Sequence, residues 1–325
     1  MISISHITRN ARAILKTWQT MRLFYCDHYE IPLPPGHRFP MRKYALLREA
    51  LCADGRFRLE PAQPIDAEIV KLAHDPAYVD QFLSGTLAAG AMRRIGFPWS
   101  EGLVKRTLAS AGGTVAAMHD AMDCGFGGTL AGGTHHAFRA EGSGFCVFND
   151  VAIAIAVLRR ERAKTRAELR VAVIDLDVHQ GDGTAHFFEC DPNVLTLSLH
   201  GANNFPFRKQ RSRIDVELRD QTGDEAYMQA LEAALPRVWE FEPEIVLYLS
   251  GVDTLASDVL GRLALTHEGL KARDRRVIEA SHARRIPIVI TLGGGYSNPI
   301  ELTAEAHANT FRIAAEVFSF ERSAG

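Results

Sequence analysis

The sequence predicts an α/β fold, a single domain whose central, mostly parallel sheet is flanked by helices. In the second half of the chain, short runs of aliphatic and β-branched residues alternate with longer stretches of helical periodicity. These runs are apolar throughout, as in parallel strands covered on both faces. Polar or glycine-rich residues follow each run, and α/β sheets bind ligands at the carboxyl ends of their strands. We therefore expect the active site there.

The elements can be assigned in order along the chain. Strands are expected at 170–177, 194–199, 245–250 and 287–292, and an earlier strand begins at Met21. Helices are expected at 151–158, 224–242, 266–285 and 300–318, with Thr266 and Asn298-Pro299 as plausible starts. No repeat or linker divides the chain. Residues 21–325 are expected to form one catalytic domain, preceded by an extension over 1–20.

Composition limits the classes of function. The 325 residues are 46% hydrophobic, enough for a sizeable core, and 37 basic side chains nearly balance 39 acidic ones. This balance disfavours nucleic acid or an anionic membrane as a partner. The longest aliphatic run, 151–158, is far shorter than the ~20 residues of a membrane span. Five scattered cysteines and the lack of a secretory signal favour the reducing cytoplasm.

Alternate residues at the end of the 170–177 strand form a candidate metal site. Asp175, Asp177 and His179 are spaced by two, so all three can project from one face. A lone Asp-x-Asp is more simply a solvated loop cluster. The added histidine, and Asp253 after the 245–250 strand, favour a divalent metal with positions left open for water and substrate.

Two adjacent histidines, His135 and His136, follow a glycine-rich loop and are candidates for general acid–base roles. A pair of this kind is often incidental. Here a metal-bound water would need such a group, and each imidazole would need a carboxylate on its far nitrogen. Asp175 and Asp182 are available for this purpose.

Tyr296, after three glycines, is either a packed loop residue or a hydrogen-bond donor to a carbonyl oxygen that becomes an oxyanion. Phe145, Cys146 and Phe205 lie near the same loops and are candidates to line an apolar slot. Aromatic residues in isolation are more often core, so this assignment depends on the rest of the site.

Six segments occur in the order found in the histone deacetylase family. They are GGTHHAF at 132–138, GFCVFND at 144–150, DLDVHQGDGT at 175–184, SLH at 198–200, SGVDTL at 250–255 and LGGGY at 292–296. The match extends from about His74 to Phe318. The chain resembles the histone deacetylase family, which is part of the zinc-dependent arginase/deacetylase superfamily. In its short length and its Gly-Gly-Thr-His-His segment it is most similar to the bacterial and class IV members.

The resemblance implies one zinc ion held by Asp177, His179 and Asp253. It implies a general base at His136 paired with Asp182, an electrostatic partner at His135 paired with Asp175, and carbonyl polarisation by Tyr296. The substrate side would comprise the carbonyl of Gly144 and a tunnel for an acylated lysine or a related acylated amine. The tunnel residues would be Phe145, Cys146, Phe205 and Leu260.

The same resemblance implies bound potassium. One site would use Asp175, Asp177, His179, Ser198 and Leu199, and a second would use carbonyls around Phe188, Asp191 and Val194. Arg42 would line an internal acetate channel.

Three alternatives stay open at this point. A two-manganese site as in arginases is disfavoured, because Asp258 lacks the two-residue spacing from Asp253. A polyamine deacetylase would carry an acidic gatekeeper where this chain has Leu260. A non-catalytic acyl-lysine reader would not need the full set of site residues. The natural substrate, acyl length and oligomeric state are open, as is the role of the basic stretch 208–213.

Overall fold

An eight-stranded sheet forms the centre of the computed structural model, which describes residues 20–163 and 168–318. All neighbouring strands are parallel, in the order β2-β1-β3-β8-β7-β4-β5-β6. The strands are β1 (Met21–Tyr25), β2 (Phe57–Pro61), β3 (Phe126–Thr129), β4 (Val171–Asp175), β5 (Val194–Gly201), β6 (Ile214–Leu218), β7 (Ile245–Leu249) and β8 (Ile288–Thr291). This confirms the predicted α/β fold with a central parallel sheet.

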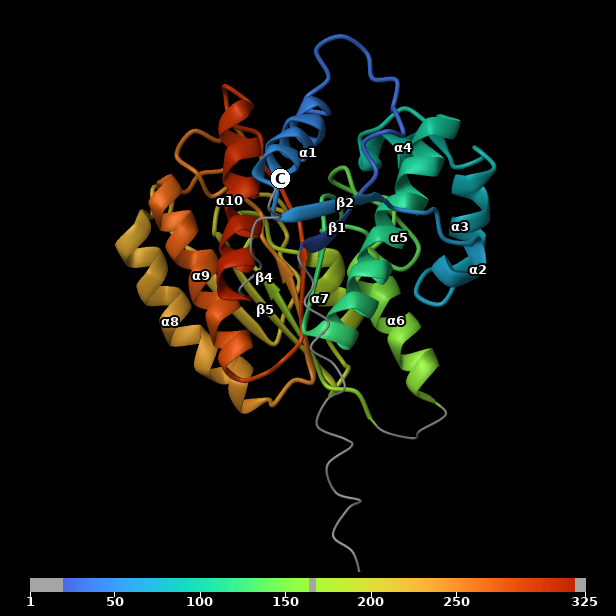
Figure 1. The fold of residues 1–325 in the computed structure, drawn as a ribbon. Helices are drawn as coiled ribbons and strands as arrows, with labels where there is room; N and C mark the ends of the chain where they lie inside the picture. The colour runs from blue at the N-terminus through green and yellow to red at the C-terminus, as the bar shows by residue number, and fades with distance from the viewer. Residues whose placement is uncertain (1–19, 164–167, 319–325) are drawn as a thin grey trace, which may run out of the picture.

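Two helical layers cover the sheet (Figure 1). One layer contains α1 (Arg42–Asp54), α8 (Asp224–Glu240), α9 (His267–Ala283) and α10 (Glu301–Val317). The other contains α5 (Glu101–Cys124) and α6 (Asp150–Arg162). Shorter helices are α2 (Ala67–Val70), α3 (Pro76–Leu83), α4 (Ala89–Ile95) and α7 (Asp182–Phe188). In the described part of the chain, no helix is long and apolar enough to cross a membrane.

The central strands are buried on both faces, which explains their continuous apolar sequence. In β4, Ala172 and Ile174 pack into the core beneath α8–α10, whereas Val171 and Val173 pack into the core beneath α5 and α6. This alternation follows from the two-residue period of a strand. Two hydrophobic cores thus hold the sheet rigid between its helices and fix the loops at its carboxyl edge.

Every predicted strand and helix is present, with ends shifted by a few residues. Helix α9 begins after Thr266, whose hydroxyl accepts a hydrogen bond from the Gly269 amide at 3.0 Å. Helix α10 begins at Glu301, after the expected start at Asn298-Pro299. The extension expected over 1–20 lies outside the described residues, except for Thr20.

Strand β3 went unpredicted because its sequence, FGGT, lacks a strand signal. A side chain at Gly127 would collide with the carbonyl oxygen of Ala117, so close packing against α5 explains the glycine. Strand β4 is also shorter than expected. It ends at Asp175, which places Asp177 and His179 in the following turn.

Candidate active site

The loops that follow five neighbouring or nearby strands surround a cavity of about 860 Å³ at the carboxyl edge of the sheet. These loops follow β3, β4, β5, β7 and β8. They bring into one cavity most of the residues predicted for the site: His135, His136, Gly144, Phe145, Cys146, Asp177, His179, Phe205, Leu260 and Tyr296. Residues separated by up to 161 positions in the chain, from His135 to Tyr296, therefore share one cavity.

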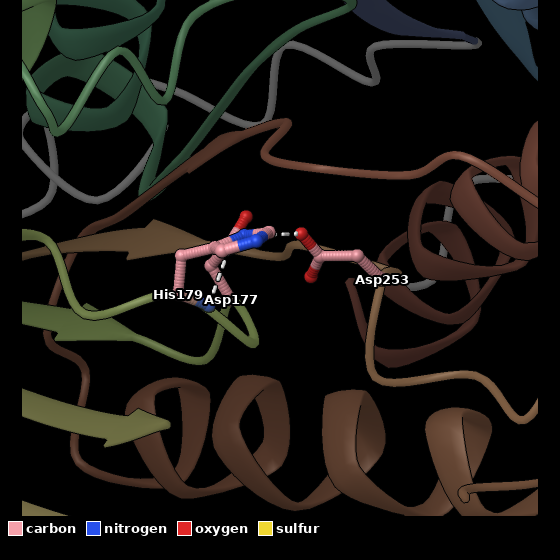
Figure 2. Close-up of side chains that lie close together, drawn as sticks. All are labelled: Asp177, His179 and Asp253. Atoms are coloured by element: carbon pink, nitrogen blue, oxygen red, sulfur yellow. Dashed lines mark hydrogen bonds and ion pairs between the residues drawn. The ribbon is translucent and has the colours of Figure 1, made fainter. Parts of the chain in front are cut away.

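Asp177, His179 and Asp253 form a compact cluster (Figure 2), of which Asp177 and His179 line the cavity. One ligand atom from each lies within 4.8 Å of the others, both aspartates are fully buried, and the side chain of His179 is only 12% exposed. His179 Nδ1 is 3.0 Å from Asp177 Oδ1 and 3.0 Å from Asp253 Oδ2. Imidazole nitrogen and carboxylate oxygen both bind zinc, and three protein ligands with an open fourth position are typical of a catalytic zinc site.

The electrostatics of this cluster favour a bound cation. Burial and the nearby charge of Asp177 raise the pKa of Asp253 to about 7. Burial opposes a charge on His179, but hydrogen bonds to the two carboxylates prevail and raise its pKa to about 10. Both pKa shifts arise because the two carboxylates concentrate negative charge in one place. A divalent cation would satisfy the same carboxylates, so these residues fit a metal.

Asp175 does not join this cluster, contrary to the expectation that it would share one face with Asp177 and His179. Its carboxylate accepts a hydrogen bond from the Asp177 amide at 3.2 Å, and His179 in turn bonds back to Asp177. These local hydrogen bonds turn the chain away from the extended conformation. Asp175 instead lies 2.7 Å from His135.

Backbone groups and a buried arginine hold the metal cluster in place. The amide of Gly294 donates to Asp177, and a Cβ at Gly294 would overlap the carboxylate of Asp253. Arg273 on α9 is fully buried and donates to the carbonyl oxygens of Gly251 at 2.7 Å and Leu176 at 3.2 Å. Arg273 thus links the two loops that carry the cluster. No sequence motif pointed to it.

His135 and His136 are buried side by side, with ring centroids 4.1 Å apart, but contact different carboxylates. His136 Nδ1 is 2.6 Å from Asp182, and burial together with the neighbouring His135 lowers its pKa to about 4. Burial also acts on His135, but Asp175 and Asp177 prevail and raise its pKa to about 9. At neutral pH one imidazole is therefore a free base and its neighbour a cation.

The loop that carries these histidines is anchored to the start of α6. Asp150 accepts hydrogen bonds from the amides of Gly133 at 3.1 Å and Thr134 at 2.8 Å. Both glycines before Thr134 have positive φ, 79° at Gly132 and 69° at Gly133, which L-residues with side chains rarely adopt. The glycine-rich segment therefore serves to turn the chain toward the cavity.

Tyr296 lies at the end of the loop after β8, with its side chain in the cavity. Its amide donates to Asp258 at 2.6 Å, and Asp258 also accepts from the amides of Leu260 and Gly261. Asp258 is thereby engaged by the backbone and is not a member of the three-residue metal cluster. This arrangement favours one metal ion over two.

Lys43 on α1 is a cavity residue that the sequence analysis missed, whereas Arg42 is not one. Arg42 is exposed and forms an ion pair with Glu301 at 3.1 Å, because consecutive helical residues point about 100° apart. Lys43 is fully buried, with Nζ 3.3 Å from the carbonyl oxygen of Gly295 and 5.1 Å from the Tyr296 ring centre. Burial lowers its pKa to about 8.

Aromatic side chains line the remaining cavity. The Phe205 ring centre is 5.0 Å from that of His136, and the Phe145 ring centre is 6.4 Å from that of Tyr296. Cys146 is buried beside them. Ser198 and Leu199 are instead buried within β5, where Ser198 pairs in register with Asp175 on β4. The carbonyl of Asp191 already accepts a hydrogen bond from Arg213.

Comparisons with known proteins identify the family. Residues 37–313 match the model of the histone deacetylase domain. An uncharacterized protein of Picosynechococcus sp. is 42% identical over 90% of this chain and 98% of its own length. A histone deacetylase-like amidohydrolase of Pseudomonas aeruginosa is 31% identical over 82% of this chain and 74% of its own length.

The fold agrees with this relationship. The solved structure of an acetylpolyamine aminohydrolase from Burkholderia pseudomallei superimposes with a TM-score of 0.72 at 22% identity, over 92% of this chain and 99% of that one. The family match spans most of the chain and all the loops that form the cavity. The chain therefore belongs to the histone deacetylase family of deacetylases and amidohydrolases, which hydrolyse amide bonds.

Proposed function

We propose that this chain is a zinc-dependent deacylase that removes acetyl or longer acyl groups from acylated lysine side chains. The observation that carries the proposal is the position of two histidines with opposite pKa shifts beside a buried Asp-His-Asp cluster. A buried base, a buried cation and an open metal site are the parts that amide hydrolysis by water requires.

Asp177, His179 and Asp253 would hold the zinc ion, which when bound polarises the amide carbonyl and acidifies water. His136 is neutral near pH 7 and takes a proton from the attacking water through Nε2, since Nδ1 faces Asp182. Asp182 fixes this tautomer and stabilises the imidazolium that forms. His135, charged beside Asp175, adds positive potential.

Tyr296 donates its phenolic hydrogen bond to the carbonyl oxygen as negative charge develops there. Burial raises the pKa of this phenol, so it keeps its proton at neutral pH. The protonated His136 then gives its proton to the leaving nitrogen. The C–N bond breaks, and a carboxylate and a free amine are released. Lys43 supports the tyrosine by binding the carbonyls of Gly293 and Gly295.

A structural potassium ion is also part of the proposal, held by Asp175, Asp177 and His179 with Ser198 and Leu199. Its support is the in-register pairing of two buried residues, Asp175 and Ser198, on adjacent strands. All five cysteines are free, which fits a cytoplasmic location.

The cavity favours an acylated lysine over an acylated polyamine as substrate, because it lacks an acidic residue at the gatekeeper position. Leu260 occupies the predicted gatekeeper position, and the only carboxylate that lines the cavity within the described residues is Asp177, which is buried. Among the described residues that line the cavity, a polycationic substrate would thus meet no exposed carboxylate.

A fluorogenic acetyl-lysine assay with and without a chelator tests the proposal. Activity should be lost on chelation and restored by stoichiometric zinc. A His136→Ala protein provides the control, because it should bind zinc yet remain inactive. Activity that persists in chelated protein shown to be free of metal would contradict the zinc-dependent mechanism. Tight substrate binding without turnover by the zinc-loaded protein would instead indicate an acyl-lysine reader.

A further inference from the structure

Large apolar side chains are exposed to solvent at the opening of the cavity. Among the described residues, only four large hydrophobic side chains are exposed, and Phe207 at 88% and Val259 at 65% far exceed the others. Both line the cavity that holds the metal cluster. Exposed apolar side chains that gather at one site, rather than scatter singly, indicate a binding surface.

These two side chains lie on loops that are tied together. Asn204, three positions after β5 ends at Gly201, donates its side-chain amide to the carbonyl oxygen of Leu260 at 2.9 Å. Lys209 binds the carbonyls of Asn204 and Pro206 at 2.6 and 2.8 Å and braces the first loop from within. Phe207 and Val259 are thus presented on a fixed lip, which we call the apolar lip.

The cavity that the apolar lip borders is also lined by arginines. Arg38, Arg94 and Arg262 line the cavity and are exposed. Arg94 and Arg262 are compensated by Glu141 at 3.2 Å and Asp220 at 3.3 Å. In the described parts of the chain, Arg38 has no ion-pair partner.

Arg208, the first residue of the basic stretch 208–213, adds to this charge. Arg208 follows Phe207 directly and is exposed, and it has no ion-pair partner among residues 20–163 and 168–318. Arg213 is not part of the opening, because it donates to the backbone carbonyls of Pro192 and Asp191, which precede β5 at the amino edge of the sheet. Arg208 is therefore the member of the stretch that adds charge beside Phe207, and the opening is apolar and cationic.

We propose that this opening binds an acidic polypeptide segment in which an apolar side chain stands next to the acylated lysine. The apolar neighbour packs on Phe207 and Val259, while carboxylates on either side face Arg38 and Arg208. The inference rests on the proposed function and deepens it. It assigns as substrate class the acidic, apolar segments of proteins, and it excludes free acetylpolyamines, whose remaining ammonium groups the arginines repel.

Matched acetyl-lysine peptides test this assignment with the full-length protein. One peptide carries Leu next to the acetyl-lysine and Glu on both flanks, a second replaces Glu with Lys, and a third replaces Leu with Ser. We expect kcat/KM for the Glu peptide to exceed that for the Lys peptide about tenfold at low salt. The difference should shrink at about 300 mM salt, where charges are screened. N-Acetylspermidine should be the poorest substrate.

Substitutions at the opening test which residues cause these peptide preferences. Phe207→Ser should remove most of the preference for the Leu peptide over the Ser peptide. Its kcat/KM should fall about fivefold more for the Leu peptide than for acetyl-lysine methylamide, which has no neighbouring residue. Arg208→Glu should reverse the preference for Glu over Lys. Arg237→Glu, at an exposed position in the last turn of α8 and outside the cavity lining, is the matched control and should change none of these ratios.

Equal kcat/KM for all peptides, or preference for the Lys peptide or N-acetylspermidine, would overturn the inference. So would a Phe207-dependent dimer, seen by light scattering, in a protein without peptide selectivity, because the apolar lip would then be a contact between copies. Peptide binding is also measured by fluorescence anisotropy with the His136→Ala protein. Selective binding without any wild-type turnover would support the inference while contradicting the proposed function.

Discussion

The imidazole Nδ1 of His136 lies 2.6 Å from the carboxylate of Asp182 inside the cavity. Asp182 begins α7, so the helix sets the position of the carboxylate. Replacing Asp182 with Asn keeps the shape but removes the charge that orients the ring. We expect Asp182→Asn to lower kcat by about 10- to 100-fold. Zinc content, measured by mass spectrometry, should stay at that of the wild type, since Asp182 is not in the metal cluster. An unchanged kcat would show that the contact between His136 and Asp182 has no role in catalysis.

Removal of the Tyr296 hydroxyl isolates the contribution of its hydrogen bond. The amide of Tyr296 is held by Asp258 and does not depend on the phenol, so Tyr296→Phe should leave the loop in place. We expect kcat to fall about 10²-fold with zinc content intact. Steady-state kinetics beside a metal assay measure both. Full activity in a zinc-loaded Tyr296→Phe protein would exclude the assigned role.

Arg273 should be essential for stability because it is buried and has several hydrogen-bonded partners. It pairs with Asp274 at 2.8 Å and donates to the loops of Leu176 and Gly251. Arg273→Met leaves Asp274 as a buried charge without its cation, so we expect the free energy of unfolding to fall by about 3 kcal/mol or more. Zinc affinity should fall as well, because these loops carry Asp177 and Asp253.

Arg275, on the exposed side of the same helix, provides the matched control for Arg273. It pairs with Glu316 and Glu279 at the surface, where ion pairs contribute little. Arg275→Met should lower the free energy of unfolding by less than about 1 kcal/mol. Equal losses of the free energy of unfolding in the two variants, measured by urea denaturation, would show that Arg273 contributes no more to stability than a surface ion pair.

Local sequence predicts some residues of the site, such as Asp177, and misses others, such as Arg273 and Lys43. Asp177 and His179 stand in a short motif after an apolar strand, so local spacing reveals both the edge of the sheet and the chemistry. Lys43 reaches Gly295 across 252 positions because α1 packs beside α10. Such contacts depend on helix packing, and no local pattern encodes them. The resemblance to the family implies the neighbouring Arg42, and a sequence match does not show which of two adjacent helical residues points inward.

A buried histidine outside the active site predicts how stability depends on pH. His74 Nε2 accepts a hydrogen bond from the amide of Asn149 at 2.9 Å, and Nδ1 donates to the carbonyl oxygen of Arg139 at 3.2 Å. A second proton would have to occupy the nitrogen that accepts from Asn149. Burial accordingly lowers the pKa of His74 from 6.5 to about 4.

The unfolded chain therefore binds a proton at His74 below about pH 6.5, while the folded protein does so only near pH 4. The stabilising effect of the neutral ring is complete above pH 6.5 and is lost as the pH falls toward 4. His74→Gln retains an acceptor without titrating. The free energy of unfolding of the wild type relative to His74→Gln should thus fall by about 2 kcal/mol between pH 7 and pH 5. Urea denaturation at each pH measures this difference. His186→Gln, at an exposed position of α7, is the control, and a difference between wild type and His74→Gln that stays constant with pH would contradict the argument.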